Sequence, residues 1–203
     1  MAHASLQLHS LVADLAAGTA AATDRRLHNA AARSAAELHR LTEASPALAR
    51  RVVSEPGALP ALVAAVAAGS ATADDPSLQG AARHSAAARI DTTKAAPEVA
   101  RCVAEERGAL AALVAAVTAG GAAAPPSLQK AAAHSAHVLG VIINGAPEFA
   151  QRLAEEPGAL QALVAAVTAG GAAVALILQE AAAVAAGLIA LITKARPELA
   201  RRV

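Results

Sequence analysis

Aromatic side chains are almost absent from this chain of 203 residues. It has no Trp, no Tyr and a single Phe, Phe149. Proteins that bind single-stranded nucleic acid use aromatic rings as platforms for the bases. Here 17 basic residues nearly balance 16 acidic ones, for a net charge of +1, so no strong field attracts nucleic acid or an anionic membrane. We therefore expect no nucleic-acid partner.

Cysteine is equally scarce, since Cys102 is the only one. A disulfide-stabilised scaffold needs paired cysteines and is excluded. The first ten residues lack the basic stretch, apolar run and small-residue cleavage site of a secretory signal. We expect an intracellular, cytoplasmic protein, with a cytoskeletal or complex-associated location as the alternative.

Alanine is what the chain has in abundance: 65 of its 203 residues, with 56% hydrophobic residues and a mean hydropathy of +0.44. This composition excludes a disordered chain. Alanine is the strongest helix former and is depleted in strands. The composition predicts one all-α domain with a core of Ala, Leu and Val.

An internal repeat covers nearly the whole chain. Segments 57–63, 108–114 and 158–164 all begin Gly-Ala-Leu and end Ala-Leu-Val. They are separated by 51 residues (108 − 57) and 50 residues (158 − 108). Leu-Gln pairs and Pro-Glu pairs recur at the same step of 50, and a degenerate copy precedes them. The chain divides into four units: 5–56, 57–107, 108–157 and 158–203.

Each unit is expected to contain three helices. In the third unit and the residues before it, Pro97 suits a first helical position and starts a short helix over 97–106. A second helix over 109–119 carries one apolar stripe. We expect Gly120 to end this helix in a left-handed conformation. A longer helix then runs over 128–143.

The order of a short Pro-Glu helix, a glycine and two further helices resembles the armadillo repeat. The residues that carry the resemblance are Pro-Glu-Phe-Ala-Gln-Arg-Leu at 147–153 and Gly-Ala-Leu-Gln-Ala-Leu-Val at 158–164. The resemblance implies a right-handed α-solenoid of about four three-helix repeats. The period of about 50 exceeds the about 42 residues of an armadillo unit, and most of the surplus lies between the second and third helices. HEAT repeats are the alternative, but the short Pro-Glu helix favours armadillo.

The resemblance also implies a groove lined by the third helices. Armadillo proteins that bind extended peptides carry there a ladder of Trp and, four residues later, a ladder of Asn. On our alignment the Trp positions fall on Arg33, His84, His134 and Val184, and the Asn positions on Glu37, Ala88, Val138 and Leu188. Because both ladders are missing, we do not expect recognition of basic peptides. We predict instead that an acidic or polar partner binds a row formed by Arg33, Glu37, His84, His134 and His137.

The last third helix, within 174–193, is the least polar of all. We predict that it docks on a partner, on a second copy or on more of a longer chain, through Val174, Leu176, Ile177, Leu188, Ile189 and Ile192. The stretch is about long enough to span a membrane. However, Glu180 lies within it and it aligns with third helices that are plainly not spans, so we expect no membrane span.

No constellation of residues indicates catalysis. His134 and His137 share a helix face, but no Cys or carboxylate stands nearby in sequence to complete a metal site. Adjacent His-Ser pairs at 84–85 and 134–135 point about 100° apart on a helix. Cys102, aligned with Leu153, is expected to be a small packed core residue. We predict no cofactor, no metal and no enzyme activity.

The leading hypothesis is a non-catalytic protein–protein interaction scaffold or adaptor, a subunit of a larger intracellular assembly. Two alternatives stay open: an architectural homo-oligomer whose ends stack on each other, and a solenoid domain accessory to an enzyme.

Overall fold

The computed structural model describes residues 2–72, 74–95, 97–171 and 175–197. Within these ranges the chain forms helices and no strand, as the alanine content predicts. The bounds are α1 Ala2–Ala20, α2 Arg25–Ala44, α3 Pro46–Ser54, α4 Ala58–Ala71, α5 Pro76–Ala95, α6 Pro97–Glu105, α7 Ala109–Ala119, α8 Pro126–Gly145, α9 Phe149–Glu155, α10 Ala159–Gly171 and α11 Leu176–Ala195.

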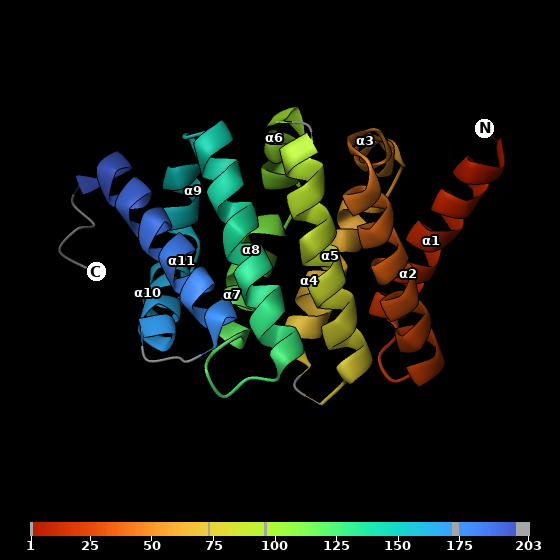
Figure 1. The fold of residues 1–203 in the computed structure, drawn as a ribbon, viewed down its shortest axis with the longest axis horizontal. Coiled ribbons are helices and arrows are strands. Elements are labelled where there is room, and N and C mark those ends of the chain that lie inside the picture. Colours follow the sequence, from red (N-terminus) through yellow and green to blue (C-terminus); the bar gives the residue numbers. More distant parts are fainter. Residues whose placement is uncertain (1, 73, 96, 172–174, 198–203) are drawn as a thin grey trace.

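The helices form two layers (Figure 1). The long helices α2, α5, α8 and α11 stand side by side in the front layer, and each packs on the next. Behind them α1, α4, α7 and α10 make the same neighbour-to-neighbour contacts. The short helices α3, α6 and α9 lie toward the upper end in this view. The order of second-layer helix, long helix and short helix therefore recurs along the chain.

The helices expected over 97–106, 109–119 and 128–143 are confirmed with small shifts. The short helix is α6, the second helix is α7 over the predicted residues, and α8 is two residues longer at each end than predicted. The next short helix, α9, begins only at Phe149, because Pro147 lies in a turn whose carbonyl accepts from the Ala150 amide at 3.0 Å. The last Pro-Glu pair stands at 197–198, and the short helix expected to start there lies almost entirely outside the described residues.

Recurring glycines have two different roles: some adopt a positive φ before a helix, and others allow two helices to approach closely. Gly57, Gly108 and Gly158 have φ of 80°, 74° and 78° and directly precede α4, α7 and α10, as expected for a chain break. Gly120 differs from the prediction, since its φ is −89° and it is not left-handed.

A close approach between layers explains Gly120 and its equivalents instead. A Cβ at Gly18, Gly69, Gly120 or Gly170 would lie between 2.1 and 2.5 Å from the Cβ of an alanine on the following long helix. These alanines are Ala31, Ala82, Ala132 and Ala182. In α4 and α10 the glycine lies inside the helix, at Gly69 and Gly170. The glycine is needed because a side chain there would push the two layers apart.

The core runs between the layers and is built from Ala, Leu and Val, as predicted. An N-terminal core cluster includes Leu15, Leu38 and Leu62, and a C-terminal core cluster includes Leu113, Leu139 and Leu163. Phe149 is also buried, with the Arg152 guanidinium carbon 4.9 Å from its ring centroid.

The prediction that Cys102 packs in the core is wrong, because this residue is exposed. The step between the short helices is 50 residues, so Cys102 is equivalent to the exposed Arg152. The residue equivalent to Leu153 is Val103, and both are fully buried. The predicted alignment was one residue out of register, which on a helix turns a side chain by about 100°.

Candidate partner-binding face

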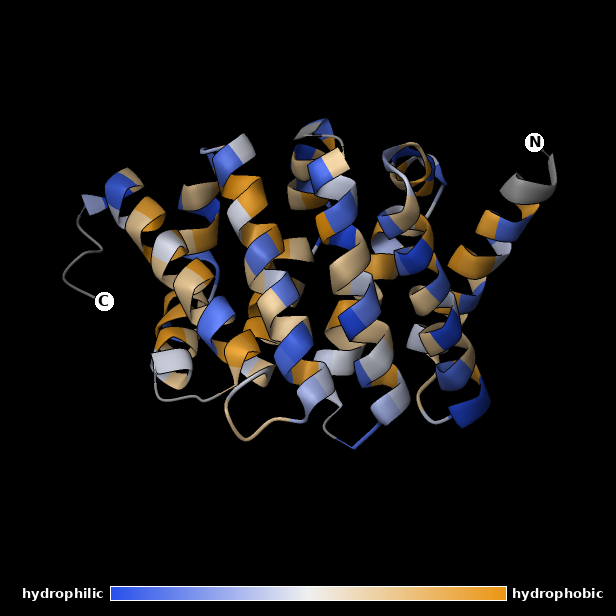
Figure 2. Ribbon diagram, in the orientation of Figure 1, coloured by the Kyte–Doolittle hydropathy of each residue, from blue (hydrophilic) through white to orange (hydrophobic). Residues whose placement is uncertain are grey.

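The exposed side of the front layer is the surface on which the predicted row lies. We call the exposed side of α2, α5, α8 and α11 the long-helix face. Arg33 on α2 is exposed, and His84 on α5 and His134 on α8 are partly buried at equivalent positions. In Figure 2 hydrophilic residues recur along the front of α2, α5 and α8, whereas α11 is mostly pale to orange.

A histidine pair links α2 to α5 on this face. The Nδ1 atoms of His39 and His84 lie 3.3 Å apart, and the ring centroids are separated by 5.5 Å. The other ring nitrogen of His39, Nε2, lies 3.7 Å from Asp91 Oδ2, which also accepts a hydrogen bond from Thr42 Oγ1 at 3.2 Å. Arg83 Nη2 donates to His84 Nε2 at 2.6 Å. His84 Nε2 is therefore an acceptor and carries no proton.

Burial and surrounding cations keep two of the histidines uncharged. Burial, together with the charges of Arg83, His39 and His134, lowers the pKa of His84 to about 4. Burial likewise lowers the pKa of His134 to about 4, with His39 and His137 contributing. At neutral pH both rings are neutral and offer hydrogen bonds rather than charge.

Positive charge on the face comes from Arg and Lys. Arg33 on α2, Arg83 on α5 and Lys130 on α8 make no ion pair with a carboxylate among the described residues. Glu37, the predicted acidic member of the row, is held by Arg40 on the same helix, with Arg40 Nε donating at 2.8 Å and Nη2 at 2.5 Å. These hydrogen bonds lower the pKa of Glu37.

Three of the four positions that align with the Asn ladder of armadillo proteins are buried. Ala88, Val138 and Leu188 are at most 1% exposed and belong to the core. Only Glu37, the first of the four, reaches solvent.

The residues of the predicted docking end at α11 differ in their exposure. Leu188 and Ile192 are 1% and 0% exposed and pack in the C-terminal core cluster, so they add almost nothing to the outer surface of this end, although Leu188 also lines a pocket between α8 and α11. The core side of a long amphipathic helix accounts for their apolar character. Leu176 is 76% exposed, Ile177 and Ile189 are partly buried, and Val174 lies outside the described residues.

Helix α11 is also the single helix, among those described, that is long and apolar enough by itself to cross a bilayer. Its mean hydropathy is 2.0 over the most apolar stretch, of which 33% is buried inside the protein. The helix packs on α8, α9 and α10.

A pocket that the predictions did not include opens between α8 and α11 on the long-helix face. It has a volume of about 340 Å³. It is lined by Lys94 from α5, by His137, Gly140, Val141 and Asn144 from α8, and by Val184, Gly187, Leu188 and Leu191 from α11. Of the predicted row, only His137 lines it. Gly140 and Gly187, which lie inside neighbouring long helices, are the sequence signal that could have indicated a pocket.

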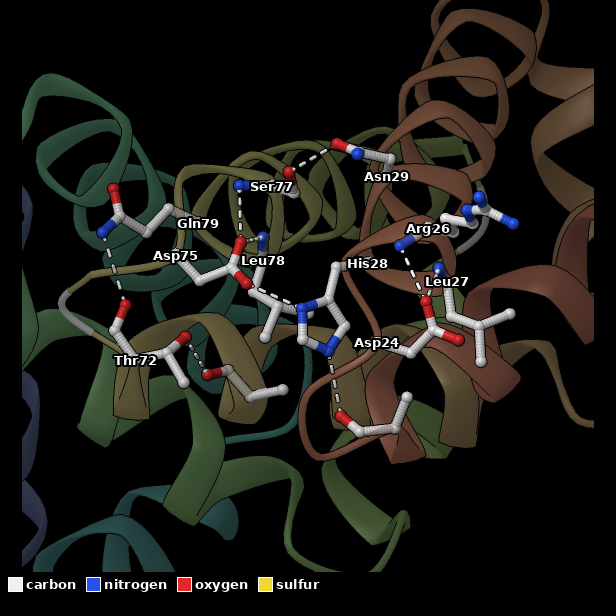
Figure 3. A network of polar contacts seen from close by, with 12 residues as sticks. Asp24, Arg26, Leu27, His28, Asn29, Thr72, Asp75, Ser77, Leu78 and Gln79 are labelled. Atoms are coloured by element: carbon white, nitrogen blue, oxygen red, sulfur yellow. Dashed lines mark hydrogen bonds and ion pairs between the residues drawn. The ribbon is translucent and has the colours of Figure 1, made fainter.

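A separate polar network joins the units at the loops (Figure 3). His28 is 3% exposed, and its Nδ1 lies 2.6 Å from Asp75 Oδ2 while its Nε2 donates to the Ala21 carbonyl at 3.0 Å. Asp75 Oδ1 accepts from the amides of Ser77 and Leu78 and so caps α5. The Ala21 hydrogen bond raises the pKa of His28; burial lowers it in part, and Asp75 raises it again.

The network continues from unit to unit. Ser77 Oγ donates to Asn29 Oδ1 at 2.7 Å, and Ser127 Oγ donates to Gln79 Oε1 at 2.9 Å, over sequence distances of 48 residues each. The polar groups of this network bind one another across neighbouring helices and loops. We therefore assign the network a structural role.

The described residues contain no group of three or more His, Cys, Asp or Glu side chains placed to hold a metal ion. Ser85 and Ser135, the neighbours of the row histidines, are fully buried in the core. Comparisons with protein-family models, with curated proteins and with solved structures gave no match.

Proposed function

We propose that this chain is a non-catalytic protein-interaction module, a scaffold or adaptor subunit of a larger intracellular assembly. In this proposal it is a right-handed α-solenoid of four armadillo-like units, and the long-helix face is its binding surface. The recurring order of helices and the contacts between equivalent helices support the architecture. A solenoid presents a preformed surface, so that little ordering entropy is lost on binding.

The observation that carries the proposal is the imbalance of charge on the face. Arg33, Arg83 and Lys130 come from three successive long helices and lack carboxylate partners there. By contrast, the acidic Glu37 is already paired with Arg40, and Asp91 lies 3.7 Å from His39 Nε2. The exposed Glu180 lies on α11, outside these three helices. Unpaired cations beside neutral histidine rings favour a partner that brings carboxylates. The proposed partner is therefore an acidic segment of another protein.

Charge reversal tests this proposal. A fluorescein-labelled peptide of alternating Glu and Ser is titrated with the chain at low salt, and its fluorescence anisotropy is recorded. We expect saturable binding that weakens with added salt. The double variant Arg33→Glu, Arg83→Glu should bind at least about tenfold more weakly, since each reversal puts like charge opposite the peptide.

A matched control is the double variant Arg51→Glu, Arg107→Glu. It makes the same change in net charge at two exposed residues of the short-helix end. Equal weakening in both variants, or a Lys–Ser peptide that binds as tightly as the Glu–Ser peptide, would contradict the proposal.

A further inference from the structure

We propose that the pocket between α8 and α11 receives one bulky apolar side chain of the same acidic partner segment. This inference rests on the proposed function and adds the identity of an anchor residue to it. The partner would be a segment in which a Leu, Ile, Met or Phe lies close to an Asp or Glu.

The pocket has the composition of an anchor site. Apolar side chains from both helices line it, among them Val141, Val184 and Leu191. Burying a partner's aliphatic or aromatic side chain against them removes apolar surface from water. Its volume of about 340 Å³ lies at the lower end of the roughly 300–1,000 Å³ typical of ligand sites. The space therefore fits one large side chain and adjoining backbone better than a cofactor.

Two glycines keep the pocket open. A Cβ at Gly140 would touch Val184 Cγ1 at 3.7 Å, which is ordinary contact, and a Cβ at Gly187 would meet nothing within 4 Å. Both residues lie inside helices, where glycine is less stable than alanine by about 1 kcal/mol. Unlike Gly69 and its equivalents, neither glycine is required by packing between helices.

The charge of Lys94 selects the flanking residues of the partner. Lys94 from α5 and His137 from α8 line the pocket, and no carboxylate does. Lys94 makes no ion pair among the described residues. A carboxylate next to the anchor would pair with Lys94 while the rest of the segment continues along the face toward Lys130 and Arg83. An apolar segment with no carboxylate, or a second copy of this chain through an apolar helix, would leave the charge of Lys94 unmatched.

Selection from a library of random short peptides displayed on phage, with the whole chain as bait at neutral pH, tests this inference. We expect the enriched peptides to combine at least one Asp or Glu with one bulky apolar residue within a few positions. The most enriched peptide is then synthesised with a fluorescent label, together with a version in which Ser replaces the apolar residue. The Ser version should bind about tenfold or more weakly.

The matched variants are Gly187→Leu and Gly121→Leu. Both add the same side chain where a Cβ meets nothing within 4 Å, so both should keep the fold. Gly187→Leu fills the pocket and should weaken the selected peptide about tenfold, whereas Gly121→Leu, in the turn after α7, should leave affinity unchanged. Circular dichroism of both variants checks that helix content is retained.

Each other outcome decides against the inference in a distinguishable way. If Gly187→Leu binds as tightly as the unmodified chain while Arg33→Glu, Arg83→Glu still weakens binding, the anchor fails and the acidic-partner proposal stands. If basic peptides or none are enriched, both fail. If the unmodified chain elutes as a dimer that Gly187→Leu converts to monomer, a second copy occupies the pocket instead.

Discussion

Arg89 carries a charged side chain that is buried in the protein interior. It is 0% exposed, and its Nε, Nη1 and Nη2 atoms find no hydrogen-bond partner among the described residues. Equivalent positions in the units on either side carry the buried Leu38 and Leu139. Burial lowers the pKa of Arg89 to about 10, with Glu106 acting in the opposite direction, so the side chain stays charged at neutral pH. A buried unpaired charge lowers the stability of the folded state.

Replacing this charge should therefore stabilise the chain. We expect Arg89→Leu to raise the free energy of unfolding by roughly 1–4 kcal/mol, because it removes the desolvated charge and restores the side chain found in the neighbouring units. Urea unfolding followed by circular dichroism measures the change. Leu139→Ala serves as the control and should lose about 2–5 kcal/mol. Lower stability of Arg89→Leu would show that the guanidinium is compensated.

The positions of some single residues could be predicted from the sequence, and those of others could not. The repeat put His84 and His134 at equivalent positions, and the structure places them so on successive long helices. Cys102 was placed in the core by an alignment one residue out of register, because the step is 51 between some elements and 50 between others. Arg89 could not have been predicted as buried, since a charged residue in an amphipathic helix is normally assigned to the solvent side.

Among the elements, the contact between each second-layer helix and its long helix depends on a glycine. The pattern of Gly near a helix end predicted a stop signal, which is the commonest role of glycine there. Its actual role is to let α4 pack closely on α5. A Cβ at Gly69 would lie 2.3 Å from the backbone oxygen of Leu78 and 2.5 Å from the Cβ of Ala82. Rules that use only the sequence around a helix end cannot predict such a contact between two helices.

Two alanine substitutions separate these roles. Gly69→Ala should destabilise the chain by about 1–3 kcal/mol, since its Cβ would collide with backbone as well as side chain of α5. Gly187→Ala should instead stabilise it by about 1 kcal/mol, because its Cβ meets open space within a helix. Thermal unfolding of both variants measures the opposite signs. A gain in stability for Gly69→Ala would contradict the close packing of α4 on α5.

The loop between α1 and α2 is tied to α5 by His28, and this contact makes stability depend on pH. The pKa of His28 is raised in the folded chain, so its contribution is complete below the unfolded value of about 6.5 and is lost as pH rises through the raised folded value. The melting temperature should therefore fall as the pH rises above about 6.5. His28→Gln should melt lower at pH 6 and lose most of this dependence; an unchanged pH profile in the variant would contradict the contribution.

At the scale of the whole molecule, composition and repeat together predicted much of the structure. The all-helical class, the helices of the third unit and the break at Gly108 follow from propensity and apolar spacing. The candidate site was predicted only in part. Its row of residues came from the repeat, whereas the pocket depends on the space between α8 and α11, to which Lys94 is brought from α5. No spacing within one helix encodes such a space.

The scarcity of aromatic residues provides a direct way to map the binding surface. The chain has seven histidines and one Phe, so the ring protons of the histidines give a simple region of the nuclear magnetic resonance spectrum. His39, His84, His134 and His137 lie on α2, α5 and α8, at the long-helix face, while the exposed His9 lies on α1 and pairs with Glu55. These rings report on separate parts of the surface.

Titration of the chain with the Glu–Ser peptide, followed by these histidine resonances, tests the central claim that the long-helix face is the binding surface. The account predicts that signals of His39, His84, His134 and His137 shift in proportion to occupancy while that of His9 stays in place. A shift confined to His9, or equal shifts at every histidine, would contradict it.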